Sequence, residues 1–123
     1  MAVAEERVFI AGAGPVGMTA AARLLRSGVP VTVFESGDNL STESRASTFH
    51  PSTLDMLEEL GAIEGLESQG LQARYLQYRS KDEGILARFD FDGIADLTRH
   101  PYRLQCEQWH LTRILLVLLK DNP

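Results

Sequence analysis

The sequence predicts an α/β fold that begins with two parallel strands joined by a helix. Three observations indicate this β-α-β unit. Residues 7–11 are rich in Val, Phe and Ile, as is typical of a strand buried on both faces. Residues 15–27 then repeat Ala and Leu at helical spacing, and residues 30–34 form a second apolar run, PVTVF. A strand, a helix and a second strand within about 30 residues are the signature of this unit.

Composition limits the class of protein and of partner. The chain has 123 residues, enough for one small domain or for part of a larger one, and its 44% apolar and 24% charged residues are ordinary for a globular protein. Its net charge of −5 argues against a nucleic-acid partner, because such a partner requires a basic face.

Cysteine content and hydropathy predict a cytoplasmic protein that does not enter membranes. Cys106 is the only cysteine, which excludes an internal disulfide and fits a reducing compartment. The first residues carry two acids where a signal peptide would be basic. The longest apolar run, residues 114–119, is far shorter than the roughly 20 residues that a membrane span needs.

The remaining elements follow from periodicity and turn residues. In chain order, the sequence predicts a loop at 36–47, a helix at 51–60, a helical turn at 63–68, strands at 73–79 and 85–91 joined by a turn at 81–84, a loop at 93–101, and a helix at 107–120. The last helix is so apolar that it must be covered on more than one face, with Trp109 and its leucines in the core. An exposed leucine face would also suit a homo-oligomer. The predicted fold is therefore an incomplete parallel sheet with an added β-hairpin and helices.

The turn after the first strand has the spacing Gly12-x-Gly14-x-x-Gly17. In a Rossmann-like dinucleotide-binding unit, the first glycine makes the tight turn and the second lets a pyrophosphate approach the backbone. The third glycine lets the helix pack closely on the strand. Three glycines alone also occur in simple turns, but here the flanking strand and helix supply the required context. We therefore predict that this turn binds a dinucleotide.

The neighbours of these glycines complete the predicted site. Ala13, Pro15 and Val16 lie within the turn, and Pro15 suits the first helical position because it lacks an N–H. Glu35 ends the second strand, where a carboxylate can accept hydrogen bonds from ribose hydroxyls, with Ser36 beside it. The carboxylate would repel a 2′-phosphate. These features do not separate FAD from NAD, since both contain a pyrophosphate and an adenosine ribose.

Three segments in order resemble FAD-dependent aromatic hydroxylases, the flavoprotein monooxygenases typified by para-hydroxybenzoate hydroxylase. They are GAGPVGMTAAARLLRSGVPVTVFE, then SRASTFHPSTLDMLEELGA, then EQWHLTRILL. The first segment is common to many FAD enzymes, whereas the three in order are more specific. The resemblance implies that Arg45 contacts the pyrophosphate or ribityl region of FAD, and that Gln108 hydrogen-bonds the same cofactor. A solvated loop arginine is the alternative for Arg45, and Gln105 is a rival of Gln108.

The resemblance also implies a reaction and its limits. Family members use NAD(P)H and O₂ to hydroxylate a small aromatic substrate on FAD, and are several times longer than this chain. Two later family signatures are absent here, so residues 1–123 are expected to form the N-terminal part of an FAD-binding domain that is not catalytically complete alone. The hairpin at 73–91 is expected to border the substrate region. No catalytic residue can be assigned, and no Cys/His spacing matches a metal site.

Two other functions are compatible with these residues. Another FAD-dependent oxidoreductase, such as an epoxidase or halogenase relative, would share the same opening segment. A non-catalytic module could use the β-α-β unit only to bind FAD or another nucleotide.

Overall fold

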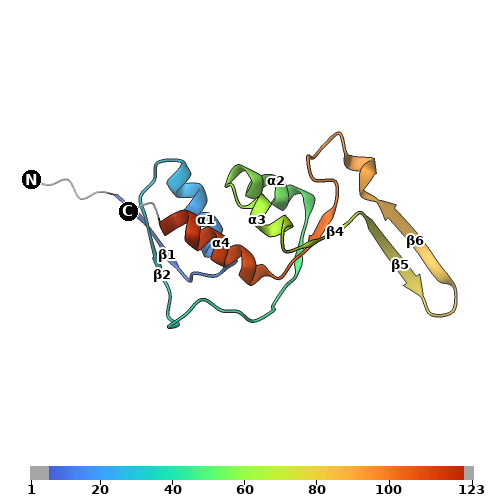
Figure 1. The fold of residues 1–123 in the computed structure, drawn as a ribbon, viewed down its shortest axis with the longest axis horizontal. Coiled ribbons are helices and arrows are strands. Elements are labelled where there is room, and N and C mark those ends of the chain that lie inside the picture. Colours follow the sequence, from blue (N-terminus) through green and yellow to red (C-terminus); the bar gives the residue numbers. More distant parts are fainter. Residues whose placement is uncertain (1–5, 121–123) are drawn as a thin grey trace, which may run out of the picture. The chain divides into compact units, whose positions relative to one another are not determined.

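The predicted β-α-β unit is present in the computed structural model, which describes residues 6–120 (Figure 1). Strands β1 (Val8–Ala11) and β2 (Val31–Phe34) pair in parallel, with Val8 opposite Val31 and Ala11 opposite Phe34. Helix α1 (Pro15–Arg26) connects them, with Pro15 in its first turn. The sequence prediction of two parallel strands in an α/β fold is confirmed.

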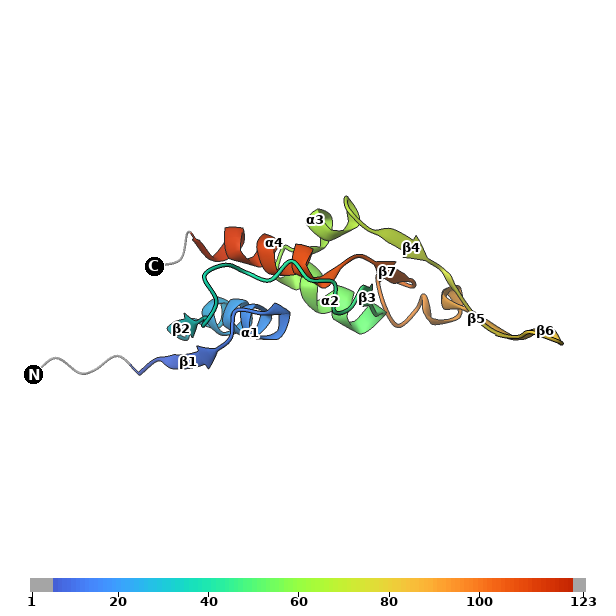
Figure 2. The ribbon, with the colours of Figure 1, turned by 90° about the horizontal axis from the view of Figure 1, so that it is seen from below.

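The chain divides into two compact units, which we call the terminal and the inserted unit. The terminal unit combines residues 6–46 with residues 107–120, and the inserted unit comprises residues 47–106. In the terminal unit, helix α4 (Gln108–Lys120) packs against α1 (Figure 2). The buried apolar residues of these two helices, Met18 and Ala21 on α1 and Leu111 and Leu115 on α4, form its core.

The composition of the first strand predicted burial on both faces, but the structure leaves most of β1 exposed. Phe9 is 66% exposed and Phe34 is 57% exposed, although their rings contact each other at a centroid distance of 5.9 Å. A strand is buried on both faces only where other elements cover both. Within residues 6–120 this sheet has two strands, and α1 packs on it without covering these rings.

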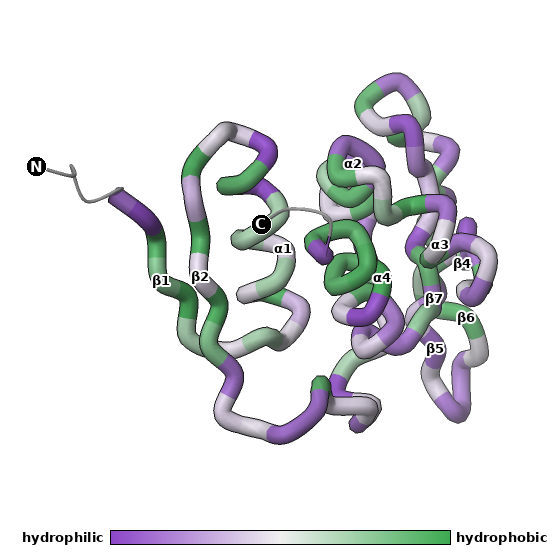
Figure 3. The backbone as a smooth tube through the Cα atoms, turned by 60° about the vertical axis from the view of Figure 1, so that its left-hand side comes forward, coloured by the Kyte–Doolittle hydropathy of each residue, from purple (hydrophilic) through white to green (hydrophobic). Residues whose placement is uncertain are grey.

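Helix α4 is also less completely covered than its composition had predicted. Its tube is coloured mostly hydrophobic in Figure 3. Leu115 is fully buried, but Val117 is 65% exposed and Leu118 is 40% exposed. Only one stripe of the helix is therefore in the core of the terminal unit. No helix within residues 6–120 is long and apolar enough to cross a membrane.

The inserted unit contains a three-stranded antiparallel sheet that sequence patterns did not predict. The strands are β3 (Thr48–Phe49), β4 (Leu71–Ala73) and β7 (Arg103–Gln105), in the order β3-β7-β4. Helices α2 (Pro51–Glu59) and α3 (Ile63–Glu67) complete the unit. Its core consists of Phe49, Leu54, Leu57, Leu66 and Leu104, all almost fully buried.

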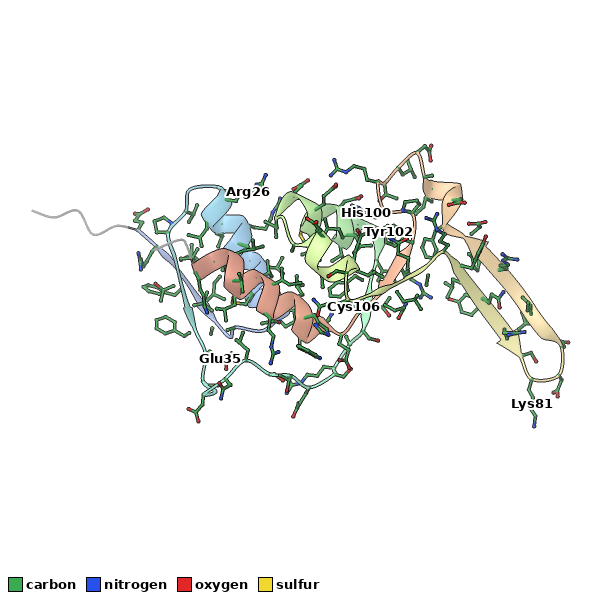
Figure 4. All side chains as sticks on the ribbon, in the orientation of Figure 1. Arg26, Glu35, Lys81, His100, Tyr102 and Cys106 are labelled. Carbon is green, nitrogen blue, oxygen red and sulfur yellow. The ribbon has the colours of Figure 1, made fainter. Side chains whose placement is uncertain are left out.

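The predicted hairpin is present in the inserted unit with shifted bounds. Strands β5 (Tyr75–Ser80) and β6 (Gly84–Asp90) pair antiparallel, with an irregularity between Tyr78 and Arg79. Lys81 lies in the turn at its tip (Figure 4). A short 3₁₀ helix, η1 (Phe91–Ile94), occupies the start of the segment that was predicted as a loop at 93–101.

Two polar contacts hold the segment before β7 against the helices of the inserted unit (Figure 4). His100 Nδ1 lies 2.7 Å from Asp55 Oδ1 on α2, and the Tyr102 hydroxyl donates to Glu67 on α3. Burial would raise the pKa of the Asp55 carboxyl, but hydrogen bonds from the side chains of His100 and Thr98 outweigh it and lower that pKa. Burial and the Glu67 carboxylate both raise the pKa of Tyr102. These contacts fix the approach of the chain to β7.

Candidate functional site

The glycine turn between β1 and α1 has the close packing that its spacing predicted. Gly12 has φ of +102°, a conformation that L side chains rarely adopt, and its N–H donates to the Phe34 carbonyl at 2.7 Å. A Cβ on Gly17 would overlap the carbonyl oxygen of Gly12 and lie 3.2 Å from the Ile10 side chain. Gly17 therefore lets α1 start directly against the end of β1.

Gly14 differs from its two partners because the space beside it is open. A Cβ built on Gly14 would meet nothing within 4 Å, and its backbone is extended, with φ of −74° and ψ of −179°. Gly14 is the residue before α1, whose first N–H groups have no partner inside the helix. Met18 N–H donates back to the Gly14 carbonyl, while the amides of Val16 and Gly17 have no acceptor within residues 6–120. An anion can therefore approach the bare backbone here.

The Glu35 carboxylate holds the edge of the same turn. Its Oε2 accepts from Ala13 N–H at 2.8 Å, and its Oε1 accepts from Gly37 N–H at 2.9 Å. The hydrogen bonds from Gly37 and Ala13 lower the pKa of Glu35, so the carboxylate stays ionised. The Ser36 hydroxyl lies 3.5 Å from Oε1. Each carboxylate oxygen offers about two acceptor positions, so Oε2, which accepts from Ala13, keeps one for a hydroxyl group of a ligand.

The loop after β2 and the start of α4 form the opposite wall of the site. Arg45 forms an ion pair with Glu43, with Nη2 to Oε2 at 2.9 Å and both side chains largely exposed. The backbone N–H of Gln108 donates to the Ala46 carbonyl at 3.0 Å. This hydrogen bond fixes the end of the loop beside the first turn of α4.

These walls enclose one cavity of about 480 Å³ within the terminal unit. Seven of the ten residues predicted from the sequence line it, namely Ala13, Gly14, Pro15, Glu35, Ser36, Arg45 and Gln108. The other three, Gly12, Val16 and Gly17, shape the turn without lining the cavity. The structure thus brings together residues from both ends of the chain.

Six lining residues were not predicted from the sequence, namely Gly37, Asn39, Ser41, Glu43, Trp109 and Thr112. Four of them lie in the loop at 36–47, which has no periodicity to indicate which side chains face inward. Trp109 was assigned to the core because it opens an apolar helix. Its position next to Gln108 was the one signal that could have identified it.

The chemistry of this cavity fits a dinucleotide better than a metal ion. Free amides and the start of α1 favour a diphosphate, and the Glu35 carboxylate can accept from ribose hydroxyls. Arg45 supplies a guanidinium, which can donate two parallel hydrogen bonds to phosphate oxygens once it leaves Glu43. Among the residues that the structure describes, no group of three His, Cys, Asp or Glu side chains could hold a metal ion.

Comparison with known proteins identifies relatives for nearly the whole chain. The profile of the FAD binding domain family matches residues 5–121. Para-nitrophenol 4-monooxygenase of Pseudomonas sp. strain WBC-3 is 27% identical over 116 residues, which are 94% of this chain and 29% of that protein. A 6-methylpretetramide 4-monooxygenase of Streptomyces rimosus is 34% identical over 109 residues, which are 89% of this chain and 19% of that protein.

A solved structure agrees with these sequence matches. The p-nitrophenol 4-monooxygenase PnpA of Pseudomonas putida DLL-E4 is similar with a TM-score of 0.86 at 30% identity, over 96% of this chain and 30% of that one. The chain therefore spans less than a third of the length of the relatives it matches.

Proposed function

Since the chain belongs to the FAD-binding domain family, we propose that it is the FAD-binding part of a flavin-dependent monooxygenase that hydroxylates an aromatic compound. The observation that carries the proposal is the single cavity shared by the glycine turn, Glu35, Arg45 and Gln108. Each of these groups matches one polar part of a flavin dinucleotide.

The proposed contacts follow from the donors and acceptors present. The open backbone at Gly14 and the start of α1, which line the cavity, bind the diphosphate. Glu35, with Ser36 beside it, accepts from the adenosine ribose. Arg45 releases Glu43 and binds phosphate or ribityl oxygens, and the Gln108 side chain hydrogen-bonds the cofactor. All of these residues belong to the terminal unit.

The bound cofactor supplies the redox chemistry, because a flavin can accept a hydride from NAD(P)H and transfer oxygen from O₂ to a ring. The protein contributes binding, orientation and exclusion of water.

Relatives named for nitrophenol and for 6-methylpretetramide support an aromatic substrate for the whole protein. The same names favour hydroxylation over the chemistry of an epoxidase or halogenase relative. NAD(P)H as the reductant and the cytoplasm as the location complete the proposal, and the lone Cys106 is consistent with that compartment.

The hairpin β5–β6 is proposed to border the substrate region. It carries exposed aromatic side chains, including Tyr78 and Phe89, whose rings meet edge to face at 6.1 Å. Exposed aromatic rings are suited to contact a flat apolar substrate.

A non-catalytic FAD-binding module is the second candidate. The cavity lined by Gly14, Glu35, Arg45 and Gln108 accounts for binding of FAD without assigning a catalytic residue, and this favours it. In that case the chain would bind FAD without consuming O₂.

Binding of FAD to the purified chain tests the proposal and separates the two candidates. Wild-type protein should retain flavin through gel filtration, with its visible absorption bands, whereas Gly14→Ala should retain much less. Val117→Ala, on the exposed side of α4, should retain as much as the wild type. Failure of the wild type to retain FAD at any concentration would refute both candidates. Oxygen uptake with NAD(P)H and an aromatic substrate, measured on the protein extended by the remaining length of its relatives, would support the monooxygenase.

A further inference from the structure

Trp109 is held in one orientation by contacts that all come from its own short segment. Its indole N–H donates to Glu107 Oε2 at 2.7 Å. The His110 ring stacks on it at a centroid distance of 3.6 Å and an angle of 26°. The Arg113 guanidinium lies 4.7 Å from the ring centroid, within the range of a cation–π contact. Because these partners lie within residues 107–113, the ring is already oriented when no ligand is bound.

The Glu107 carboxylate is a strong acceptor for the indole N–H of Trp109. Hydrogen bonds from the Trp109 indole and then from the Ser44 side chain lower the pKa of Glu107, so its carboxylate remains ionised. A charged acceptor makes a stronger hydrogen bond to N–H than a neutral one. The contact from Ser44 also connects Glu107, the residue before α4, with the loop that carries Arg45.

Trp109 lines the same cavity as Gly14, Pro15 and Gln108. The indole thus lines the cavity in which the proposed cofactor would lie. Among the described residues that line this cavity, Trp109 is the one aromatic residue, and the others are aliphatic or polar. A rigid aromatic wall strengthens binding because little side-chain entropy is lost when the ligand arrives.

We propose that Trp109 is a further cofactor-binding residue, whose indole makes direct van der Waals contact with the bound flavin dinucleotide. This inference rests on the proposed FAD site. It assigns Trp109 a role that differs from core packing, because a core tryptophan would affect folding without affecting affinity selectively.

Affinity measurements on variants give the first test. Trp109→Ala removes the wall and should raise the Kd for FAD by about three- to tenfold, the range expected for loss of one aromatic contact. Trp109→Phe keeps an aromatic ring and should recover most of the affinity. Val117→Ala, on the same helix but outside the cavity, should bind FAD as the wild type does. Equal Kd values for wild type and Trp109→Ala would overturn the inference.

A second measurement avoids mutation and any folding defect that it causes. Trp109 is the only tryptophan of the chain, so protein labelled with 5-fluorotryptophan gives one ¹⁹F resonance. Addition of FAD should shift that resonance in proportion to the flavin retained. Retained flavin with an unmoved resonance would overturn the contact with Trp109 and leave the proposed function intact. Absence of retained flavin would overturn the proposed function itself, and with it this inference.

Discussion

Gly14 and Gly17 lie one turn apart on the chain, yet the surroundings of their missing side chains differ. The space beside Gly14 is empty, whereas a Cβ on Gly17 would overlap the Gly12 carbonyl. Gly14 is therefore open toward a ligand, and Gly17 is required by the packing of the protein itself.

This difference predicts that one alanine substitution lowers stability and the other lowers affinity for FAD. Gly17→Ala should lower the free energy of unfolding by about 1–3 kcal/mol, because backbone must shift to admit the methyl group. Gly14→Ala should change it by less than about 0.5 kcal/mol but weaken FAD binding about tenfold or more. Chemical denaturation and FAD titration of both variants provide the measurement. A Gly14→Ala protein that binds FAD normally would contradict the approach of the diphosphate at this residue.

Glu35 makes the stability of the fold depend on pH, and the sign of this dependence follows from the hydrogen bonds of its carboxylate. The N–H groups of Gly37 and Ala13 lower its pKa in the folded protein. A lowered pKa stabilises the fold at pH values above the ordinary carboxyl pKa, and this contribution is lost as the pH falls through the folded value. Glu35→Gln does not titrate and should lack this dependence.

The difference in melting temperature between wild type and Glu35→Gln should therefore be largest near neutral pH. It should shrink in acid, below the lowered pKa of the carboxyl. Thermal denaturation of both proteins across this range checks the prediction, with Glu6→Gln as a control at an exposed acid. A difference that stays constant with pH would show that the carboxylate does not hold Ala13 and Gly37.

Among the elements, α4 shows most clearly what sequence patterns can and cannot determine. Its existence and its bounds follow from an apolar run after Glu107, and the structure confirms the helix within one residue. The identity of its buried side cannot be derived from that run, because leucines occur around most of the helix. The structure buries Leu111, Thr112 and Leu115 and leaves Val117 exposed.

This distribution predicts unequal costs for truncation along α4. Leu115→Ala should lower the free energy of unfolding by about 2–5 kcal/mol, as for other fully buried leucines. Val117→Ala, at an exposed position, should change it by less than about 0.5 kcal/mol. Urea denaturation monitored by circular dichroism measures both. Equal costs would mean that Val117 is covered in solution.

The sheet of the inserted unit was not predicted because its strands are short and their pairing is non-local. Strands of two or three residues are too short to show alternation, and Phe49 pairs with Leu104, far away in the chain. By contrast, the β-α-β unit is continuous in sequence and carries local signals at each boundary. The site was predicted where such signals exist, at the glycine turn and Glu35. The residues of the site in the loop at 36–47 were missed, because apolar and polar residues show no periodicity there.

At the scale of the whole molecule, the two ends of the described chain form one unit, and the middle forms another. Every residue that lines the proposed cofactor cavity belongs to the terminal unit. The hairpin β5–β6 and the core around Leu54, Leu57 and Leu66 belong to the inserted unit. Ligand binding stabilises the state that binds it by mass action, and its direct effects fall on the segments it touches.

Hydrogen exchange with and without FAD should therefore show a discontinuous pattern of protection. We expect slower exchange in three segments that are far apart in sequence, namely 12–18, 35–46 and 108–113, because their amides line the cavity or are held by residues that line it. The hairpin at 75–90 lines no part of this cavity and should exchange at nearly the same rate in both conditions. Protection confined to the hairpin would place the ligand elsewhere. At a FAD concentration near the wild-type Kd, Gly14→Ala should reduce the protection in all three segments together, since they share one ligand.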